Sequence, residues 1–130
     1  MRWDIVEHAE DLALRGAQIV VEATRRAAAR HARCRIALAG GSTPRRVYEF
    51  LSGRDPAVGT RLRDAVDWSE VEVFFGDERY VPPDHAESNY RMAREALLAH
   101  VPLSAAQVHP WPTAAGDPGV TAPATGGVNW

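Results

Sequence analysis

The sequence predicts an α/β fold: a partial doubly wound (Rossmann-like) parallel sheet with flanking helices. Two short apolar runs, Cys34–Ala39 and Val71–Phe75, have the length and the residue types of buried strands. Segments with apolar residues at helical spacing precede, separate and follow these runs. Strands that alternate with helices in this way are typical of right-handed β-α-β units, in which helices cover both faces of a parallel sheet.

The predicted elements follow in chain order. The first is a helix over residues 7–31, whose apolar face we assign to Leu12, Ile19, Val20, Ala23 and Ala27. After the first strand we expect a helix over 44–51, a helical turn over 61–66, the second strand, a helix capped by Ser88 and a third strand over 107–109. Residues 113–130 show neither helical nor strand periodicity and are predicted to form an irregular, disordered tail.

Length and charge limit the function classes. A chain of 130 residues is about one domain long. Its net charge of −2 and pI near 6.2 do not indicate nucleic-acid or membrane-surface binding. No apolar run approaches the ~20 residues of a membrane span. Cys34 is the only cysteine, which fits a reducing compartment, so we expect a cytoplasmic protein.

The basic residues are all arginines. There are fifteen of them and no lysine. A Schiff-base or lysine-general-base mechanism is therefore excluded for this chain. Arginine is the only fixed cation that it offers to a phosphate group.

A glycine-rich turn follows the first predicted strand. Gly40 and Gly41 permit backbone angles and close approaches that a side chain would block. Ser42 or Thr43 can cap the next helix, and Pro44 suits its first turn. A strand, a glycine turn and a helix N-terminus present unpaired N–H groups and a positive dipole end to an anion. The segment therefore predicts a phosphate cradle, with an ordinary strand-to-helix turn as the alternative.

A charged triplet, Asp77-Glu78-Arg79, follows the second predicted strand. The carboxyl ends of parallel strands meet at one edge of a sheet, so the two loops are expected to open on the same side. Arg79 can then contact a substrate phosphate or a developing oxyanion, with Asp77 or Glu78 orienting it. The alternative is a self-satisfied Asp–Arg or Glu–Arg cluster that only holds the loop.

Two segments resemble the signatures of the 6-phosphogluconolactonase family. The first runs from Leu38 to Pro44 and continues with Val47, Tyr48 and Leu51; the second comprises Asp77-Glu78-Arg79, Val81-Pro82, Asp84-His85 and Ser88-Asn89-Tyr90. Related glucosamine-6-phosphate deaminases share a similar turn, but their Asp-Glu pair is typically followed by tyrosine. Arg79 and the Ser88-Asn89-Tyr90 run therefore favour the lactonase branch. On this resemblance, residues 1–112 are the N-terminal portion of a sugar-phosphate lactonase or isomerase-type domain.

The resemblance implies a reaction and a set of residue roles. The reaction is hydrolysis of 6-phosphoglucono-δ-lactone to 6-phosphogluconate, in the pentose phosphate pathway, without a metal or an organic cofactor. By position, the substrate- and phosphate-binding residues are Gly40, Gly41, Ser42, Thr43, Asp77, Glu78, Arg79 and Asn89. In this set Arg79 contacts phosphate or negative charge, and Asp77 and Glu78 support the pocket. Asn89 either joins the pocket or connects the loop to the following helix.

The resemblance also implies a missing catalytic histidine. In the family it lies in a later Gly-x-Asp-Gly-His-Thr-type motif, which this sequence does not contain. We therefore expect the C-terminal half of the family fold to be absent, through truncation, a frameshift or a split protein, and the chain's own activity stays open. Of the five histidines, His85 is the best substitute base, His109 is ambiguous, and His8, His31 and His100 suit surface or capping roles.

Two alternatives to an active lactonase remain. One is a non-catalytic sugar-phosphate-binding fragment. The other is a deaminase or isomerase in which Asp77 is the proton-transfer base. Half of a doubly wound sheet also leaves an unpaired edge and an uncovered apolar face. We expect the isolated chain either to be unstable or to self-associate through that edge.

Overall fold

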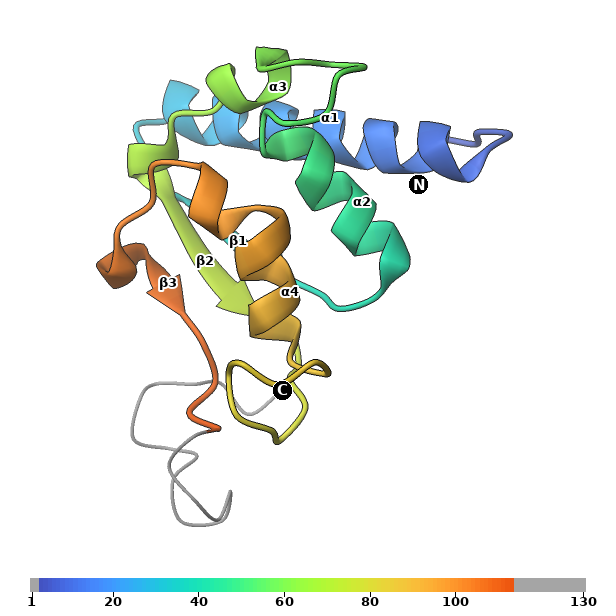
Figure 1. The fold of residues 1–130 in the computed structure, drawn as a ribbon. Helices are drawn as coiled ribbons and strands as arrows, with labels where there is room; N and C mark the ends of the chain where they lie inside the picture. The colour runs from blue at the N-terminus through green and yellow to red at the C-terminus, as the bar shows by residue number, and fades with distance from the viewer. Residues whose placement is uncertain (1–2, 114–130) are drawn as a thin grey trace.

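The computed structural model describes residues 3–113. Its helices are α1 (Ala9–Ala29), α2 (Ser42–Leu51), α3 (Arg61–Asp64) and α4 (Asn89–Ala96), and its strands are β1 (Cys34–Leu38), β2 (Val71–Phe75) and β3 (Val108–His109) (Figure 1). One-turn 3₁₀ helices cover Trp68–Glu70, Leu98–His100 and Ala105–Gln107. The predicted tail lies, apart from its first residue, outside the described residues.

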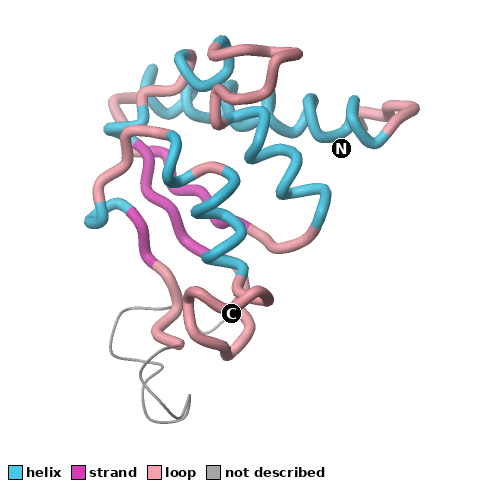
Figure 2. Tube along the Cα trace, viewed as in Figure 1, coloured by secondary structure: helices cyan, strands magenta, loops and turns pink. Residues whose placement is uncertain are grey.

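The three strands form one parallel sheet in the order β1-β2-β3. Cys34 pairs with Val71 at one end of the β1–β2 ladder and Leu38 with Phe75 at the other, while Val73 pairs with Val108. The helices α2 and α4 lie in front of the strands, and α1 runs across the top (Figures 1 and 2). The predicted parallel α/β sheet with flanking helices is therefore confirmed.

The described residues cover only one face of this sheet. That face carries Val71, Val73 and Phe75, each at most 2% exposed. The opposite face is open among the described residues, as expected for half of a doubly wound sheet; it carries Arg35, Ala37, Glu72, Phe74 and His109. It is also less apolar than predicted, because Arg35 and His109 contact Glu72 and the Phe74 ring stacks on His109 at 4.6 Å. Within residues 3–113, β1 pairs only with β2; self-association through its other edge stays a prediction.

The buried face of α1 differs from the predicted one. Leu12 and Ile19 are 48% and 43% exposed, and the buried positions are Ala13, Ala17, Val21 and Thr24. Small side chains allow the backbones of α1 and α2 to approach closely. At Gly16 the approach is such that a Cβ atom would lie 3.0 Å from Val47 Cγ2. The close-packed seam thus follows the smallest residues of α1, one helical position away from its larger aliphatic side chains.

Arg46 joins α1, α2 and the loop that follows α2. Its guanidinium contacts Glu10 at 2.6 Å, Asp55 at 2.7 Å and Glu49 at 3.3 Å. It also lies 4.2 Å from the centroid of the Phe50 ring. Three carboxylates therefore surround one cation, and they fix the relative positions of the two helices.

This cluster predicts an acid-sensitive contribution to stability. Hydrogen bonds from Arg46 lower the pKa of Glu10 below its ordinary 4.5, and the Ala57 N–H followed by Arg46 lowers the pKa of Asp55 below 3.8. A carboxyl with a lowered folded-state pKa stabilises the fold above its unfolded pKa, and this stabilisation is lost as the pH falls through the folded value. We expect the free energy of unfolding in urea to decline below about pH 4.5, and to decline less steeply in Arg46→Ala. The exposed Arg61→Ala serves as the control, and equal acid slopes in all three proteins would contradict this assignment.

Candidate anion-binding site

A pocket of about 230 Å³ lies where the loops after β1 and β2 meet the N-terminal end of α4. Its walls are Gly41, Ser42, Arg45, Arg79, Ala86, Glu87, Ser88, Asn89 and Met92. The two predicted loops therefore open on the same side of the sheet. Of the predicted site residues, the structure brings Gly41, Ser42, Arg79 and Asn89 together in this pocket.

The first loop delivers the N-terminus of α2 to the pocket. Gly41 is the N-cap residue and has φ 108°, in the left-handed region that favours glycine. The prediction that Ser42 or Thr43 caps the helix is wrong, because the helix begins at Ser42 and both hydroxyl residues lie inside its first turn. No side chain caps this end, and its first turn contains no acidic residue. The N–H groups of the first turn therefore lack a side-chain acceptor, and Gly41 and Ser42 at this end line the pocket.

Tyr48 fixes the position of this loop. Its hydroxyl accepts a hydrogen bond from the Ala39 N–H at 2.8 Å and donates one to the Ala39 carbonyl at 2.9 Å. Burial raises the pKa of the Tyr48 phenol, so it remains protonated and able to donate. The residue before the Gly40-Gly41 turn is thereby held against α2.

Tyr48→Phe is expected to destabilise the fold by about 1–3 kcal/mol, because it removes two hydrogen bonds between the buried Tyr48 hydroxyl and the Ala39 backbone, each worth about 0.5–1.5 kcal/mol. Urea unfolding measures this change directly. Tyr80→Phe is the matched control, since Tyr80 is 45% exposed and its loss should change stability little. A Tyr48→Phe protein as stable as the parent would show that water replaces the phenol.

The second loop is organised by the Glu78 carboxylate. It accepts hydrogen bonds from the backbone N–H groups of Arg79, Asn89 and Tyr90 at 2.7–2.9 Å, and from the Ser88 hydroxyl at 3.3 Å. Glu78 thus occupies the N-terminus of α4, where the helix dipole favours a negative charge. As predicted, Ser88 caps the same helix, accepting from the Arg91 N–H. The anion position at α4 is therefore filled by the protein itself.

The Arg79 guanidinium is hydrogen-bonded to uncharged acceptors. Its Nη1 donates to the Glu87 carbonyl at 3.2 Å and to Asn89 Oδ1 at 3.0 Å. Within residues 3–113 no carboxylate lies within the 4.0 Å of an ion pair from its guanidinium. The alternative of an Asp–Arg or Glu–Arg cluster is therefore not what the structure shows. The arginine charge remains available to a ligand in the pocket.

Asn89 connects the two loops. It is 4% exposed at the start of α4, and its amide donates to the Asp77 carbonyl and carboxylate at 3.3 Å while its Oδ1 accepts from Arg79. On its other side it lies against Gly40, where a Cβ atom would stand 2.7 Å from Asn89 Cγ. The glycine is thus required by a close approach. Of the two predicted roles of Asn89, the structure shows the connection between the second loop and the following helix; contact with a ligand stays a prediction.

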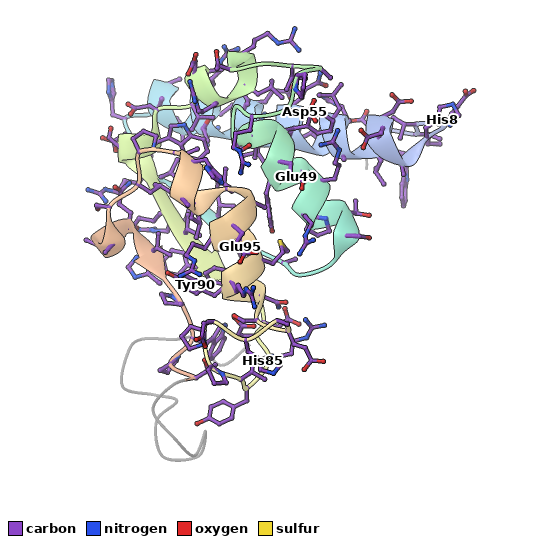
Figure 3. All side chains as sticks on the ribbon, in the orientation of Figure 1. His8, Glu49, Asp55, His85, Tyr90 and Glu95 are labelled. Carbon is purple, nitrogen blue, oxygen red and sulfur yellow. The ribbon has the colours of Figure 1, made fainter. Side chains whose placement is uncertain are left out.

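The remaining predicted residues lie outside the pocket walls. Gly40, Thr43, Asp77 and Glu78 do not line it, and neither does His85, whose Nδ1 accepts from the Glu87 N–H at 3.0 Å. Figure 3 shows His85 on the loop next to α4, and His8 at the distant end of α1. All five histidines lie in the described range, and none of them lines the pocket. The pocket offers no imidazole base.

Arg45 is a pocket residue that the sequence analysis missed. Its position, one helical turn after Gly40-Gly41, could have indicated a pocket residue. However, Arg45 and Arg46 are adjacent, and the sequence does not show which of the two faces the loops. In residues 3–113, no three metal-ligating side chains form a cluster. No helix in the same range is long and apolar enough to cross a bilayer.

The sequence profile of the family described as glucosamine-6-phosphate isomerases/6-phosphogluconolactonase matches residues 7–126. The chain belongs to this family. The resemblance in the two loops is therefore confirmed. The glucosamine-6-phosphate isomerase/6-phosphogluconolactonase match also extends beyond residue 112, into residues that the structure does not describe.

Individual relatives are similar over most of this chain. It is 49% identical to a 6-phosphogluconolactonase of Synechocystis sp. over 83 residues, which cover 64% of the chain and 30% of that protein. It is 42% identical to the enzyme of the same name from Nostoc sp. over 87 residues, covering 67% and 32%. The solved structure of 6-phosphogluconolactonase from Trypanosoma brucei matches with a TM-score of 0.70 and 34% identity, covering 89% of this chain and 41% of that one.

The chain thus spans about a third of the length of the curated relatives that it matches. It spans 41% of the trypanosomal structure and 44% of a devB protein structure, which matches with a TM-score of 0.74. The shared part of the family domain contains both loops and the pocket between them.

Proposed function

We propose that this chain carries the phosphate-binding part of a 6-phosphogluconolactonase site, and that its ligand is 6-phosphoglucono-δ-lactone or the product 6-phosphogluconate. One observation carries the proposal: the uncapped first turn of α2 shares a pocket with the Arg79 guanidinium, which has no ion-pair partner among residues 3–113. Backbone N–H groups at a helix N-terminus and a guanidinium fork are complementary to phosphate oxygens.

The size of the pocket supports the proposal that it binds the phosphate end of the ligand. Pockets for complete small molecules usually have volumes of about 300–1,000 Å³. The 230 Å³ here suit a phosphate group and leave most of the attached sugar outside the pocket walls. The family reaction, opening of a lactone ring by water, then takes place at the sugar end, beyond the groups that hold the phosphate.

Lactone hydrolysis needs a base that accepts a proton from water, and histidine is the most common provider near neutral pH. None of the described histidines lines the pocket. Binding without turnover is accordingly the activity that the described residues support, because this sequence does not contain the histidine motif of the family. A deaminase in which Asp77 transfers protons is less well supported, because Asp77 lies outside the pocket walls and is hydrogen-bonded to Asn89.

Calorimetric titration with 6-phosphogluconate, gluconate and glucosamine 6-phosphate tests the proposal. We expect 6-phosphogluconate to bind and gluconate, which lacks the phosphate, not to bind. A second assay follows acid release from fresh 6-phosphogluconolactone, corrected for spontaneous hydrolysis, and we expect no acceleration by this chain alone. Absence of 6-phosphogluconate binding would overturn the proposal, and ammonia release from glucosamine 6-phosphate would assign the deaminase branch.

A further inference from the structure

We propose that Arg45 is a second phosphate-binding arginine of this site, facing Arg79 across the pocket, and that the pair selects dianionic phosphate esters over sugar acids with a single charge. The inference rests on the proposed function in one respect: the phosphate lies between the first turn of α2 and Arg79. The inference adds Arg45, which neither of the two family signatures in the loops includes, and a preference for dianionic ligands.

The contrast between two adjacent arginines carries the inference. Arg46 is held by three carboxylates and the Phe50 ring. Arg45 lines the pocket, is exposed, and has no carboxylate within 4.0 Å among residues 3–113. Successive residues of a helix point about 100° apart, so one guanidinium can face α1 while its neighbour faces α4.

The surroundings of Arg45 also contain acidic residues. Glu87 lines the same pocket, and Glu95, labelled on α4 in Figure 3, has a pKa that is lowered first by a hydrogen bond from Arg91 and then, at longer range, by Arg94 and Arg45. Two guanidinium groups, those of Arg45 and Arg79, nevertheless border one pocket without an ion-pair partner in the described residues. Two positive charges that border one pocket favour the entry of an anion.

The charge of the ligand follows from this arrangement. A phosphate ester carries about −1.5 to −2 charges at pH 7, and a carboxylate carries one. The backbone N–H of Arg45 is already bonded to the Gly41 carbonyl at 3.1 Å, and Pro44 has no N–H, so Arg45 contributes its side chain and Ser42 and Thr43 contribute their amides. Two guanidinium forks and a helix N-terminus suit a phosphate dianion; a single sugar-acid carboxylate leaves one arginine without a partner.

Calorimetry on four proteins tests the role of Arg45: the parent chain, Arg45→Ala, Arg45→Lys and Arg94→Ala. Arg94 is an exposed arginine near Glu95 that does not line the pocket, so its loss removes the same charge from a neighbouring position. The probes are 6-phosphogluconate and inorganic phosphate at constant ionic strength. We expect about tenfold weaker binding of both by Arg45→Ala, partial recovery in Arg45→Lys and unchanged binding in Arg94→Ala.

A pH series separates a phosphate contact from a structural role. Phosphate loses its second charge as the pH falls through about 6, so the parent should lose more affinity between pH 7.5 and 5.5 than Arg45→Ala does. Dissociation constants of Arg45→Ala within about twofold of the parent would overturn the inference. If inorganic phosphate binds through Arg45 and 6-phosphogluconate does not bind, the proposed function fails and the Arg45 assignment stands. If the parent binds neither probe, both fail.

Discussion

Replacing Arg79 by alanine is expected to weaken 6-phosphogluconate binding by about 10- to 150-fold. The estimate corresponds to the loss of a charge-assisted hydrogen bond, worth about 1.5–3 kcal/mol. Its physical basis is that the Arg79 guanidinium lines the pocket and is oriented by Asn89 and the Glu87 carbonyl, without an ion-pair partner in the described residues. Calorimetric titration of parent and variant gives the ratio of dissociation constants.

Two further variants control this measurement. Arg79→Lys retains the charge but not the planar fork, so an intermediate affinity is expected. Arg94→Ala lowers the net charge by the same amount outside the pocket and should leave the affinity unchanged. If Arg79→Ala bound 6-phosphogluconate as tightly as the parent while remaining folded, Arg79 would be excluded from the site.

The second large effect is expected at Gly40. A methyl group added there would collide with the Asn89 amide, whose Cγ lies 2.7 Å from the Cβ position. Displacing Asn89 breaks its hydrogen bonds to Arg79 and Asp77, so binding should weaken together with stability. We expect Gly40→Ala to destabilise the fold by about 1–3 kcal/mol, as overpacking of a well-packed position usually does. Urea unfolding and calorimetry measure the two effects.

Gly76 provides the matched control, because a Cβ atom there would lie 3.7 Å from the Leu38 carbonyl, at ordinary contact distance. Gly76→Ala should be neutral or slightly stabilising, by about 0.4–1 kcal/mol. In the Asn89→Ala background the obstacle is gone, so Gly40→Ala should cost much less than in the parent. Equal costs in both backgrounds would show that Asn89 is not the group that requires a glycine at position 40.

The sheet, the helices and the meeting of the two loops could be predicted because each leaves a local signal. The Val71–Phe75 run is β-branched and aromatic, Ser88 caps the helix after it, and the Gly40-Gly41 turn follows a strand. A parallel sheet then places the ends of neighbouring strands at one edge without any further information.

The features that could not be predicted depend on contacts between distant residues. Leu12 and Ile19 fit a helical period as well as the buried positions do, and only the close approach of α1 to α2 decides between the two faces. The lack of a side-chain cap on α2 depends on the backbone conformation of Gly41. Likewise, the different surroundings of Arg45 and Arg46 arise from carboxylates located on α1 and in a later loop.

The most direct test of a single anion site built from two loops is a nuclear magnetic resonance titration with 6-phosphogluconate. It follows the backbone amide of Ser42 and the side-chain Nε–H of Arg79 in the same sample. We expect both signals to shift with one common dissociation constant and neither to respond to gluconate. Movement of only one signal, or two distinct dissociation constants, would contradict a shared phosphate site.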